Sequence, residues 1–172
     1  MIEGTAEQWP VSAAIDPDGQ EGSAMYNEIL VPVDGSIAGQ RGLDEALALA
    51  KQLGSRLVLL HVVEDFPITL ELAPVSSFDD SRAALVEAGR AILDKAASQA
   101  TAAGVPHIKL LNEQTATRAA DAIVEQARQK ECRLIVMGTH GRRGVNRLVM
   151  GSDAVNVLRA APVPVLFVRV QE

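Results

Sequence analysis

A glycine-rich segment at residues 138–152 carries the clearest chemical signal in the sequence. An apolar run at 134–137 leads into it, and it ends at Gly151-Ser152, where a helix can begin. Glycine lets backbone N–H groups approach an anion closely, and the positive end of a helix favours negative charge. The segment also holds three arginines, Arg142, Arg143 and Arg147. Together these features predict a phosphate-binding loop.

The spacing of the glycines excludes two familiar phosphate-binding loops. The segment contains no Gly-Lys-Ser/Thr, which the Walker loop requires. Gly138, Gly141 and Gly144 are spaced three apart, which does not match the Gly-x-Gly-x-x-Gly pattern of dinucleotide-binding folds. The pattern that remains is Gly138-x2-Gly141-x9-Gly151-Ser152.

Strand and helix patterns alternate along the rest of the chain. We expect strands at 28–34, 56–63, 107–113, 133–138 and 162–170, helices around 43–53, 79–103, 117–130 and 152–160, and a loop at 64–78. Such alternation predicts a single α/β domain with a five-stranded, largely parallel sheet and helices on both faces. Asp34, Val62 and Gly138 fall at carboxyl ends of strands, where ligands of such sheets bind. Asp34 either takes part in binding or only caps the first helix.

The composition limits the classes of partner. Only 3% of the 172 residues are aromatic, so the core is expected to be aliphatic, and the net charge of -6 argues against nucleic acid or an anionic membrane as partner. The sequence has no apolar run long enough for a membrane span and no secretory signal pattern, so we expect a cytoplasmic protein. Residues 1–25 lack periodicity and are expected to be a flexible or loosely docked extension of a domain at 26–172.

Catalytic and metal-binding patterns are missing from the sequence. Cys132 is the only cysteine and is expected to be a small buried hydrophobe. His61 ends an apolar run and is expected to be structural, and the three histidines show no metal-ligand spacing. Ser36 and Ser152 have no evident histidine and acid partners, so nucleophilic catalysis is not predicted.

Four segments together resemble the universal stress protein family. The Gly-x2-Gly-x9-Gly-Ser pattern after an apolar strand is similar to the nucleotide-binding signature of that family. Residues 29–36 resemble its first strand and turn, residues 59–62 its second strand, and residues 164–168 its last strand. The likeness covers about residues 26–170.

The resemblance implies an ATP-binding member, with AMP or ADP as alternative ligands and Mg as a possible companion. It implies a strand order of 3-2-1-4-5 and a homodimer joined through residues 164–170, whose apolar edge also invites pairing. Asp34 and the backbone of Val62 would face the adenine, and Pro32 and Gly138 would lie near the ribose. The phosphates would be lined by Met137, Gly141, Gly151, Ser152 and Asp153. At least one arginine, with Arg142 the first candidate, either contacts a phosphate or belongs to a solvated loop.

Asp153 departs from the commoner pattern of the family, which has a small or apolar residue after Gly-Ser. A carboxylate beside a triphosphate is repulsive unless a metal bridges it or it points away. Alternatively, Asp153 is a first-turn acid that interacts favourably with the helix dipole, a contribution of about 0.3–1 kcal/mol. Ser152 is expected both to cap the helix and to donate to a phosphate.

Three functions are compatible with the sequence. The first is a nucleotide-binding stress or regulatory protein with an unknown protein partner and at most slow ATP hydrolysis, since no general base is evident. The second is a nucleotide-free dimeric interaction module. The third is an enzyme such as an adenylyl transferase, which would need a histidine-rich phosphate motif near the first strand. Residues 34–39 contain no histidine, which argues against the third.

Overall fold

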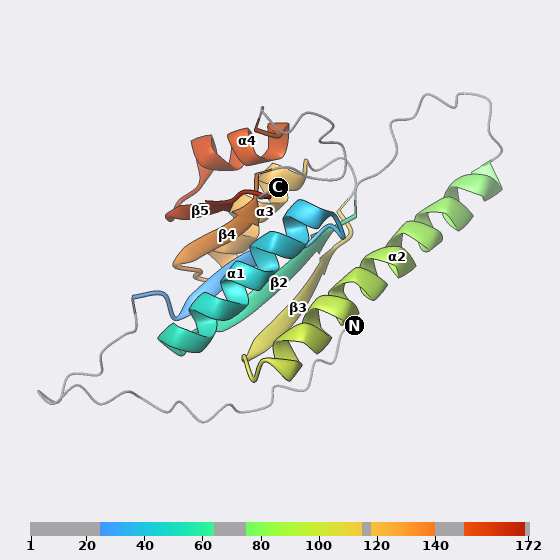
Figure 1. The fold of residues 1–172 in the computed structure, drawn as a ribbon. Coiled ribbons are helices and arrows are strands. Elements are labelled where there is room, and N and C mark those ends of the chain that lie inside the picture. The colour runs from blue at the N-terminus through green and yellow to red at the C-terminus, as the bar shows by residue number, and fades with distance from the viewer. Residues whose placement is uncertain (1–24, 64–74, 115–117, 140–149, 171–172) are drawn as a thin grey trace, which may run out of the picture.

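The protein folds into a three-layered α/β domain (Figure 1). The computed structural model describes residues 25–63, 75–114, 118–139 and 150–170, with backbone only for 75–80. The strands are β1 (Glu28–Pro32), β2 (Arg56–Val62), β3 (His107–Asn112), β4 (Leu134–Gly138) and β5 (Val165–Val168). The helices are α1 (Ile37–Leu53), α2 (Val75–Ala102), α3 (Ala119–Gln129) and α4 (Ser152–Ala160).

The five strands form one parallel sheet in the order β3-β2-β1-β4-β5, which confirms the predicted order. β1, at the centre, pairs with β2 in a register that joins Pro32 to Leu60, and β4 lies on its other side. The chain therefore passes from β1 to one side of the sheet, and after β3 it crosses to the other side. Strand order reverses between β1 and β4, so their carboxyl ends form the switch point of the fold.

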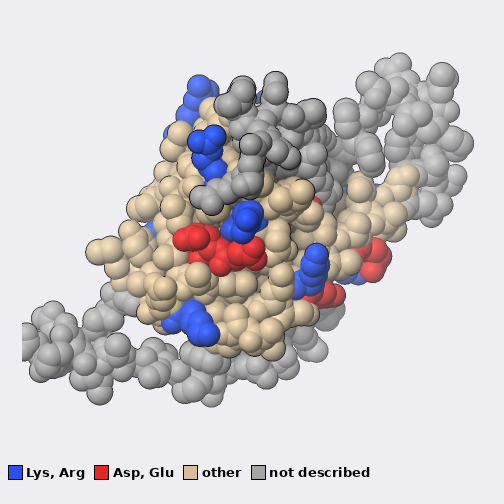
Figure 2. All heavy atoms as spheres, viewed as in Figure 1, with Lys and Arg blue, Asp and Glu red and all other residues tan. Residues whose placement is uncertain are grey.

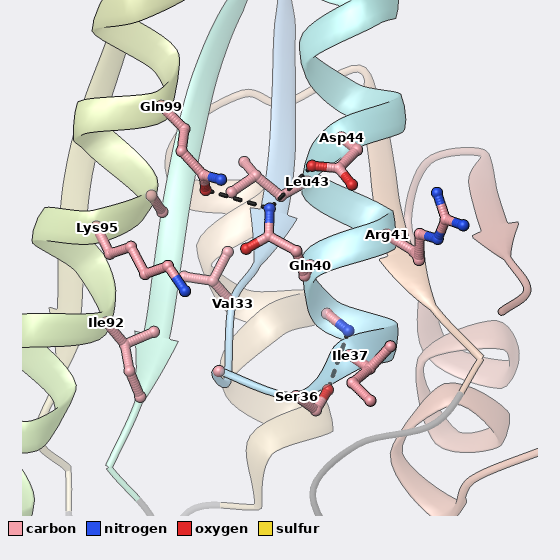
Figure 3. Close-up of a pocket in the computed structure, with 13 residues that line it drawn as sticks. Val33, Ser36, Ile37, Gln40, Arg41, Leu43, Asp44, Ile92, Lys95 and Gln99 are labelled. Atoms are coloured by element: carbon pink, nitrogen blue, oxygen red, sulfur yellow. Dashed lines mark hydrogen bonds between the residues drawn. The ribbon is translucent and has the colours of Figure 1, made fainter.

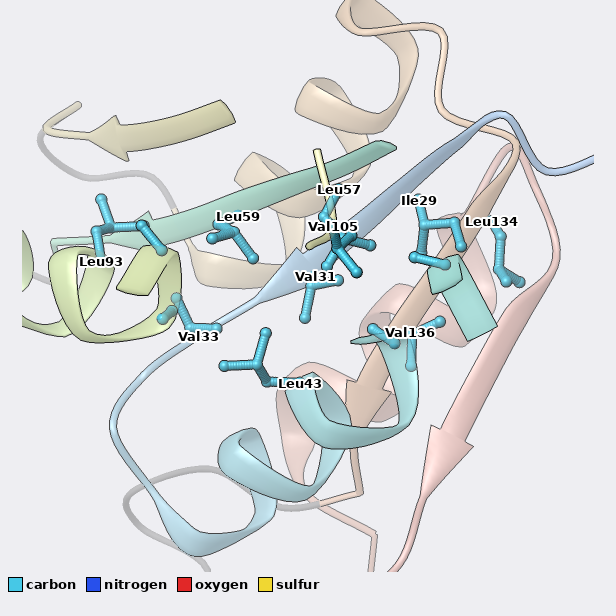
Figure 4. Close-up of a cluster of buried hydrophobic side chains, with 14 residues drawn as sticks. Ile29, Val31, Val33, Leu43, Leu57, Leu59, Leu93, Val105, Leu134 and Val136 are labelled. Carbon is cyan, nitrogen blue, oxygen red and sulfur yellow. The ribbon is translucent and has the colours of Figure 1, made fainter. Parts of the chain in front are cut away.

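Each face of the sheet packs against two helices, and the core is aliphatic as predicted. One cluster of side chains joins β1, β2 and β4 to α1 and α2 (Figure 4), and the other joins them to α3 and α4. β1 supplies both clusters, since Ile29 and Val31 point to one face and Leu30 to the other. This alternation, with all three side chains fully buried, explains why the strand reads as a continuous apolar run.

Several element boundaries differ from those predicted. α2 begins at Val75, so residues 75–78, which were expected in a loop, are helical. α1 begins at Ile37, six residues before the first periodic leucine, because Ser36 provides an N-cap there. β1 ends at Pro32 rather than at Asp34, and β5 covers only Val165–Val168.

The surface over α1 and α2 carries acidic and basic side chains close to one another (Figure 2). In the part of the chain that the structure describes, no helix is long and apolar enough to cross a bilayer.

Candidate functional site

The carboxyl ends of β1, β2 and β4 and the first turn of α4 make up the candidate site. Pro32 is the last residue of β1, as expected, and Val62 is the last residue of β2. Gly138 ends β4, and Ser152 begins α4. The amide of Val33 donates to the carbonyl of Leu60 at 2.8 Å, so β1 and β2 remain joined up to the residue before Asp34.

Asp34 organises the turn between β1 and α1. Its Oδ1 accepts hydrogen bonds from the Ser36 amide at 2.9 Å and from the Ser36 hydroxyl at 2.7 Å. The Ser36 hydroxyl oxygen in turn accepts from the amide of Gly39 at 2.9 Å. Ser36, rather than Asp34, therefore caps α1, and Asp34 orients the capping residue. A Cβ at Gly39 would collide with Asp34 Oδ1, so a side chain there would displace the carboxylate from this position.

Gly138 lies against the backbone of α1. A Cβ at this position would lie 2.5 Å from the carbonyl carbon of Ala38 and 2.9 Å from its Cβ. A Cβ at Gly42 would lie 2.9 Å from the amide nitrogen of Gly138, so the approach is tight from both sides. The first glycine of the signature therefore has a packing role whether or not a ligand is bound. The signal that could have revealed it is the pair of small residues, Ala38 and Gly42, one helical turn apart.

Thr139 joins three elements around the base of the glycine-rich segment. Its amide donates to the carbonyl of Val168 in β5 at 3.1 Å, and its carbonyl accepts from the amide of Gly151 at 2.9 Å. These two bonds fix the residues on either side of 140–149. That segment, with Gly141 and Arg142, lies outside the described residues. Sequence patterns do not indicate the role of Thr139, because it depends on pairing between distant positions.

The first turn of α4 presents backbone amides at the same edge. The N-cap is Gly151, which has no side chain to accept a hydrogen bond from the first amides of the helix. The expectation that Ser152 is the cap is therefore wrong: it is the first helical residue, and it is exposed. Asp153 lies in the first turn and is partly buried. The first amides of the helix and the helix dipole make this end favourable for an anion.

The two residues expected to be structural are buried. The Nδ1 atom of His61, whose side chain is 3% exposed, donates to the carbonyl of Val33 at 2.6 Å. Cys132 is 2% exposed within the core beside α3, and burial, reinforced by the nearby Glu28 carboxylate, raises the pKa of its thiol to about 12. Among the described residues, no group of histidine, cysteine and acidic side chains could hold a metal ion.

The fold and the switch point are those of a doubly wound α/β protein. The chain belongs to the universal stress protein family, whose pattern matches residues 25–169. Universal stress protein MJ0531 of Methanocaldococcus jannaschii is 33% identical over 150 residues, which span 87% of this chain and 86% of that protein.

Two solved structures extend the comparison. A universal stress protein family member from Burkholderia pseudomallei has 34% identity and a TM-score of 0.68, with 86% of this chain and 98% of the other covered. A universal stress protein in complex with cAMP has 25% identity and a TM-score of 0.61, with 84% and 97% covered. The fold and the family agree with what the sequence predicted.

Proposed function

We propose that this protein binds ATP, or the related nucleotides ADP and AMP, and acts as a dimeric regulatory protein of the universal stress family. The observation that carries the proposal is the hydrogen bond between Thr139 and Gly151. This bond brings the end of β4 and the start of α4 together at the topological switch point. The two bonded residues lie on either side of residues 140–149. The relative in complex with cAMP supports an adenine nucleotide as ligand.

The proposed contacts follow from where each element ends. Asp34 and the backbone of Val62 would contact the adenine. Asp34 follows β1, and Val62 is the last residue of the neighbouring strand β2. Pro32 and Gly138 would lie near the ribose. The phosphates would be held by Met137, Gly141, Arg142, Gly151, Ser152 and Asp153. Backbone amides at the start of α4 would supply much of this binding, since they have no side-chain cap.

Nucleotide binding would order the surface around the glycine-rich segment and so change what a protein partner meets. We propose no catalytic residue, and we expect hydrolysis to be slow at most. Mg would matter if Asp153 faces the phosphates, since a cation would then offset the repulsion between the two negative groups.

Calorimetry and thermal unfolding of the full chain with ATP, ADP and AMP, each with and without Mg, test the proposal. A ligand at 100 times its Kd adds about 2.7 kcal/mol to the free energy of unfolding. Asp34→Asn keeps an oxygen that can accept from Ser36 but removes the charge, and we expect it to weaken nucleotide binding. Asp44→Asn, on the exposed face of α1, is the matched control and should bind as the wild type does.

Unchanged melting in millimolar nucleotide would overturn the proposal and favour the nucleotide-free interaction module. Equal nucleotide affinity in Asp34→Asn and Asp44→Asn would leave the function standing but remove Asp34 from the binding site. The co-purified small molecule, identified by mass spectrometry after denaturation, provides an independent test of which nucleotide the site prefers.

We also propose that two copies of the chain associate through β5. The carbonyl of Pro164 accepts a hydrogen bond from Ile135 in β4, and that of Val168 accepts one from Thr139, which follows β4. Val165 and Phe167 therefore direct their backbone groups to the other edge of the strand. Among the described residues, no strand pairs with that edge. An unpaired apolar edge is a natural surface for a second copy.

A further inference from the structure

A pocket lies between α1 and α2, with Val33, Gly35 and Ser36 on either side of Asp34 among its lining residues (Figure 3). Its volume is about 350 Å³, within the range of small-molecule sites. Among the described residues, none of those proposed to hold the nucleotide lines it. It opens beside the turn that follows β1, and its walls come from both helices.

The floor of the pocket is apolar. Val33, which follows β1, and Leu43 of α1 are both buried and line the floor. Ile92 and Ala96 of α2 line it from the other side. The turn after β1 closes one end, because a Cβ at Gly35 would lie 3.2 Å from Ile92 Cδ1. Gly35 has a φ of +79°, which a side chain would strain, so both the conformation and the space favour glycine here. These surfaces suit the apolar body of a small molecule.

The amide and carboxylate groups at the other end already bind one another. Gln40 Nε2 donates to Asp44 Oδ1 at 2.8 Å and to Gln99 Oε1 at 3.2 Å, across the space between the two helices. The Asp44 carboxylate is therefore engaged by an amide within its own helix. Asp44 keeps its negative charge, so a ligand's carboxylate would bind away from it, at Lys95.

Lys95 supplies the charge that a ligand would meet. Its side chain extends from α2 toward Val33, while Arg41 points to the opposite side of α1 (Figure 3). The neighbouring Asp94 binds Lys109 at 2.6 Å. In the described part of the chain, Lys95 makes no hydrogen bond or ion pair. An ammonium group without a partner beside an apolar floor is complementary to a carboxylate attached to an apolar body.

We propose that this pocket is a second ligand site, for a small amphipathic monocarboxylate whose apolar body rests on Val33, Leu43 and Ile92 and whose carboxylate binds Lys95. The proposal does not depend on nucleotide binding, because the two sets of residues are distinct. A site for an uncharged apolar molecule would not require the ammonium group of Lys95. A site for a cation would require a negative charge in its place.

Titration of the full chain with octanoate, followed by amide NMR, tests the proposal. Octanol and octylammonium are probes of the same length with no charge and with the opposite charge. We expect octanoate to shift the signals of residues lining the pocket, and Lys95→Gln to weaken its affinity about tenfold or more. Lys51→Gln, an exposed lysine in the last turn of α1, is the matched control and should bind octanoate as the wild type does.

Charge reversal gives a second, independent readout. Lys95→Glu changes an exposed side chain, so the fold should persist, and the variant should lose octanoate and gain octylammonium. No binding of octanoate to the wild type, equal affinity in Lys95→Gln, or equal binding of octanol would overturn the proposal. Shifts confined to residues outside the pocket would overturn it as well.

Discussion

Gly138 and Ala38 lie so close that a single added carbon would force α1 away from the sheet. A Cβ on Gly138 would be 2.5 Å from the carbonyl carbon of Ala38, and the atoms it meets are mainly backbone. Backbone cannot turn aside as a flexible side chain can. The contact therefore couples the end of β4, where the glycine-rich segment begins, to the first turns of α1, which follow Asp34.

Gly138→Ala should destabilise the fold even without a ligand. Overpacking of this kind costs about 1–3 kcal/mol, and for a chain of this size each kcal/mol lowers the Tm by about 2–4 °C. Urea unfolding of the ligand-free protein measures the loss. Gly54→Asn is the control, because Gly54 has open space around it and a φ of +67°, which asparagine tolerates. Equal stability of Gly138→Ala and the wild type would mean that α1 can shift freely.

Ser36→Ala should cost about 1 kcal/mol, because it removes the N-cap of α1. It also removes a donor to Asp34 and so loosens the turn that carries this carboxylate. Chemical unfolding of the variant and of Ser98→Ala gives the comparison. Ser98 is exposed in α2, and its hydroxyl donates to the carbonyl of Asp94 one turn earlier, so its loss should change stability little. Similar losses in the two variants would contradict the capping role.

The approximate residues at which the strands end could be predicted from the sequence, because each strand is a short run of mostly apolar residues. The positions of Val62 and Gly138 at carboxyl ends follow from those runs alone, whereas β1 was expected to reach Asp34 and ends two residues earlier, at Pro32. The strand order came from the family resemblance, since the runs alone do not say which strands are neighbours. The same reasoning predicted that Cys132 and His61 are buried.

The remaining features depend on contacts between residues far apart in the chain. The packing of Ala38 on Gly138 requires knowledge of which helix crosses which strand. The bonds of Thr139 to Gly151 and Val168 require the position of β5. The N-cap at Gly151, where serine was expected, depends on how the chain enters α4, and the pocket between α1 and α2 depends on how two helices pack. Local patterns carry none of this information.

The thiol of Cys132 should resist modification in the native protein. Its pKa of about 12 leaves almost no thiolate near neutral pH. A disulfide reagent at pH 8 should therefore react only after urea unfolds the chain, and mixing the reagent with native and unfolded protein measures the difference. Rapid reaction of the native protein would show that Cys132 is accessible and that its side chain is not held in the core.

The same pKa shift makes stability depend on pH in the alkaline range. Because the folded state holds the proton more tightly than the unfolded state, the contribution is fully present below the ordinary pKa of 9.0 and is lost as pH rises toward about 12. The difference in free energy of unfolding between the wild type and Cys132→Ala should therefore shrink as the pH rises above 9. A constant difference between pH 8 and pH 10.5 would contradict this.

Leu166→Lys should weaken association of two copies through β5. Leu166 is 36% exposed on this strand, and a lysine at a strand edge opposes pairing. Light scattering after size exclusion should show a dimer for the wild type and a shift toward monomer for the variant. Leu158→Lys is the control, because Leu158 is 57% exposed on α4, outside β5. A monomeric wild type, or equal dissociation of both variants, would contradict the proposed dimer.

Asp153→Asn separates the two roles available to this carboxylate. Both Asp153 in α4 and Asp121 in α3 lie in the first turn of a helix, so each asparagine variant should lose a similar dipole contribution, about 0.3–1 kcal/mol. If Asp153 faces the phosphates, as we propose, only Asp153→Asn should bind ATP more tightly without Mg, and its affinity should depend less on Mg than that of the wild type. Calorimetry of both variants with and without Mg measures this. Equal ATP affinity in Asp153→Asn and Asp121→Asn at every Mg concentration would show that Asp153 acts only on its helix.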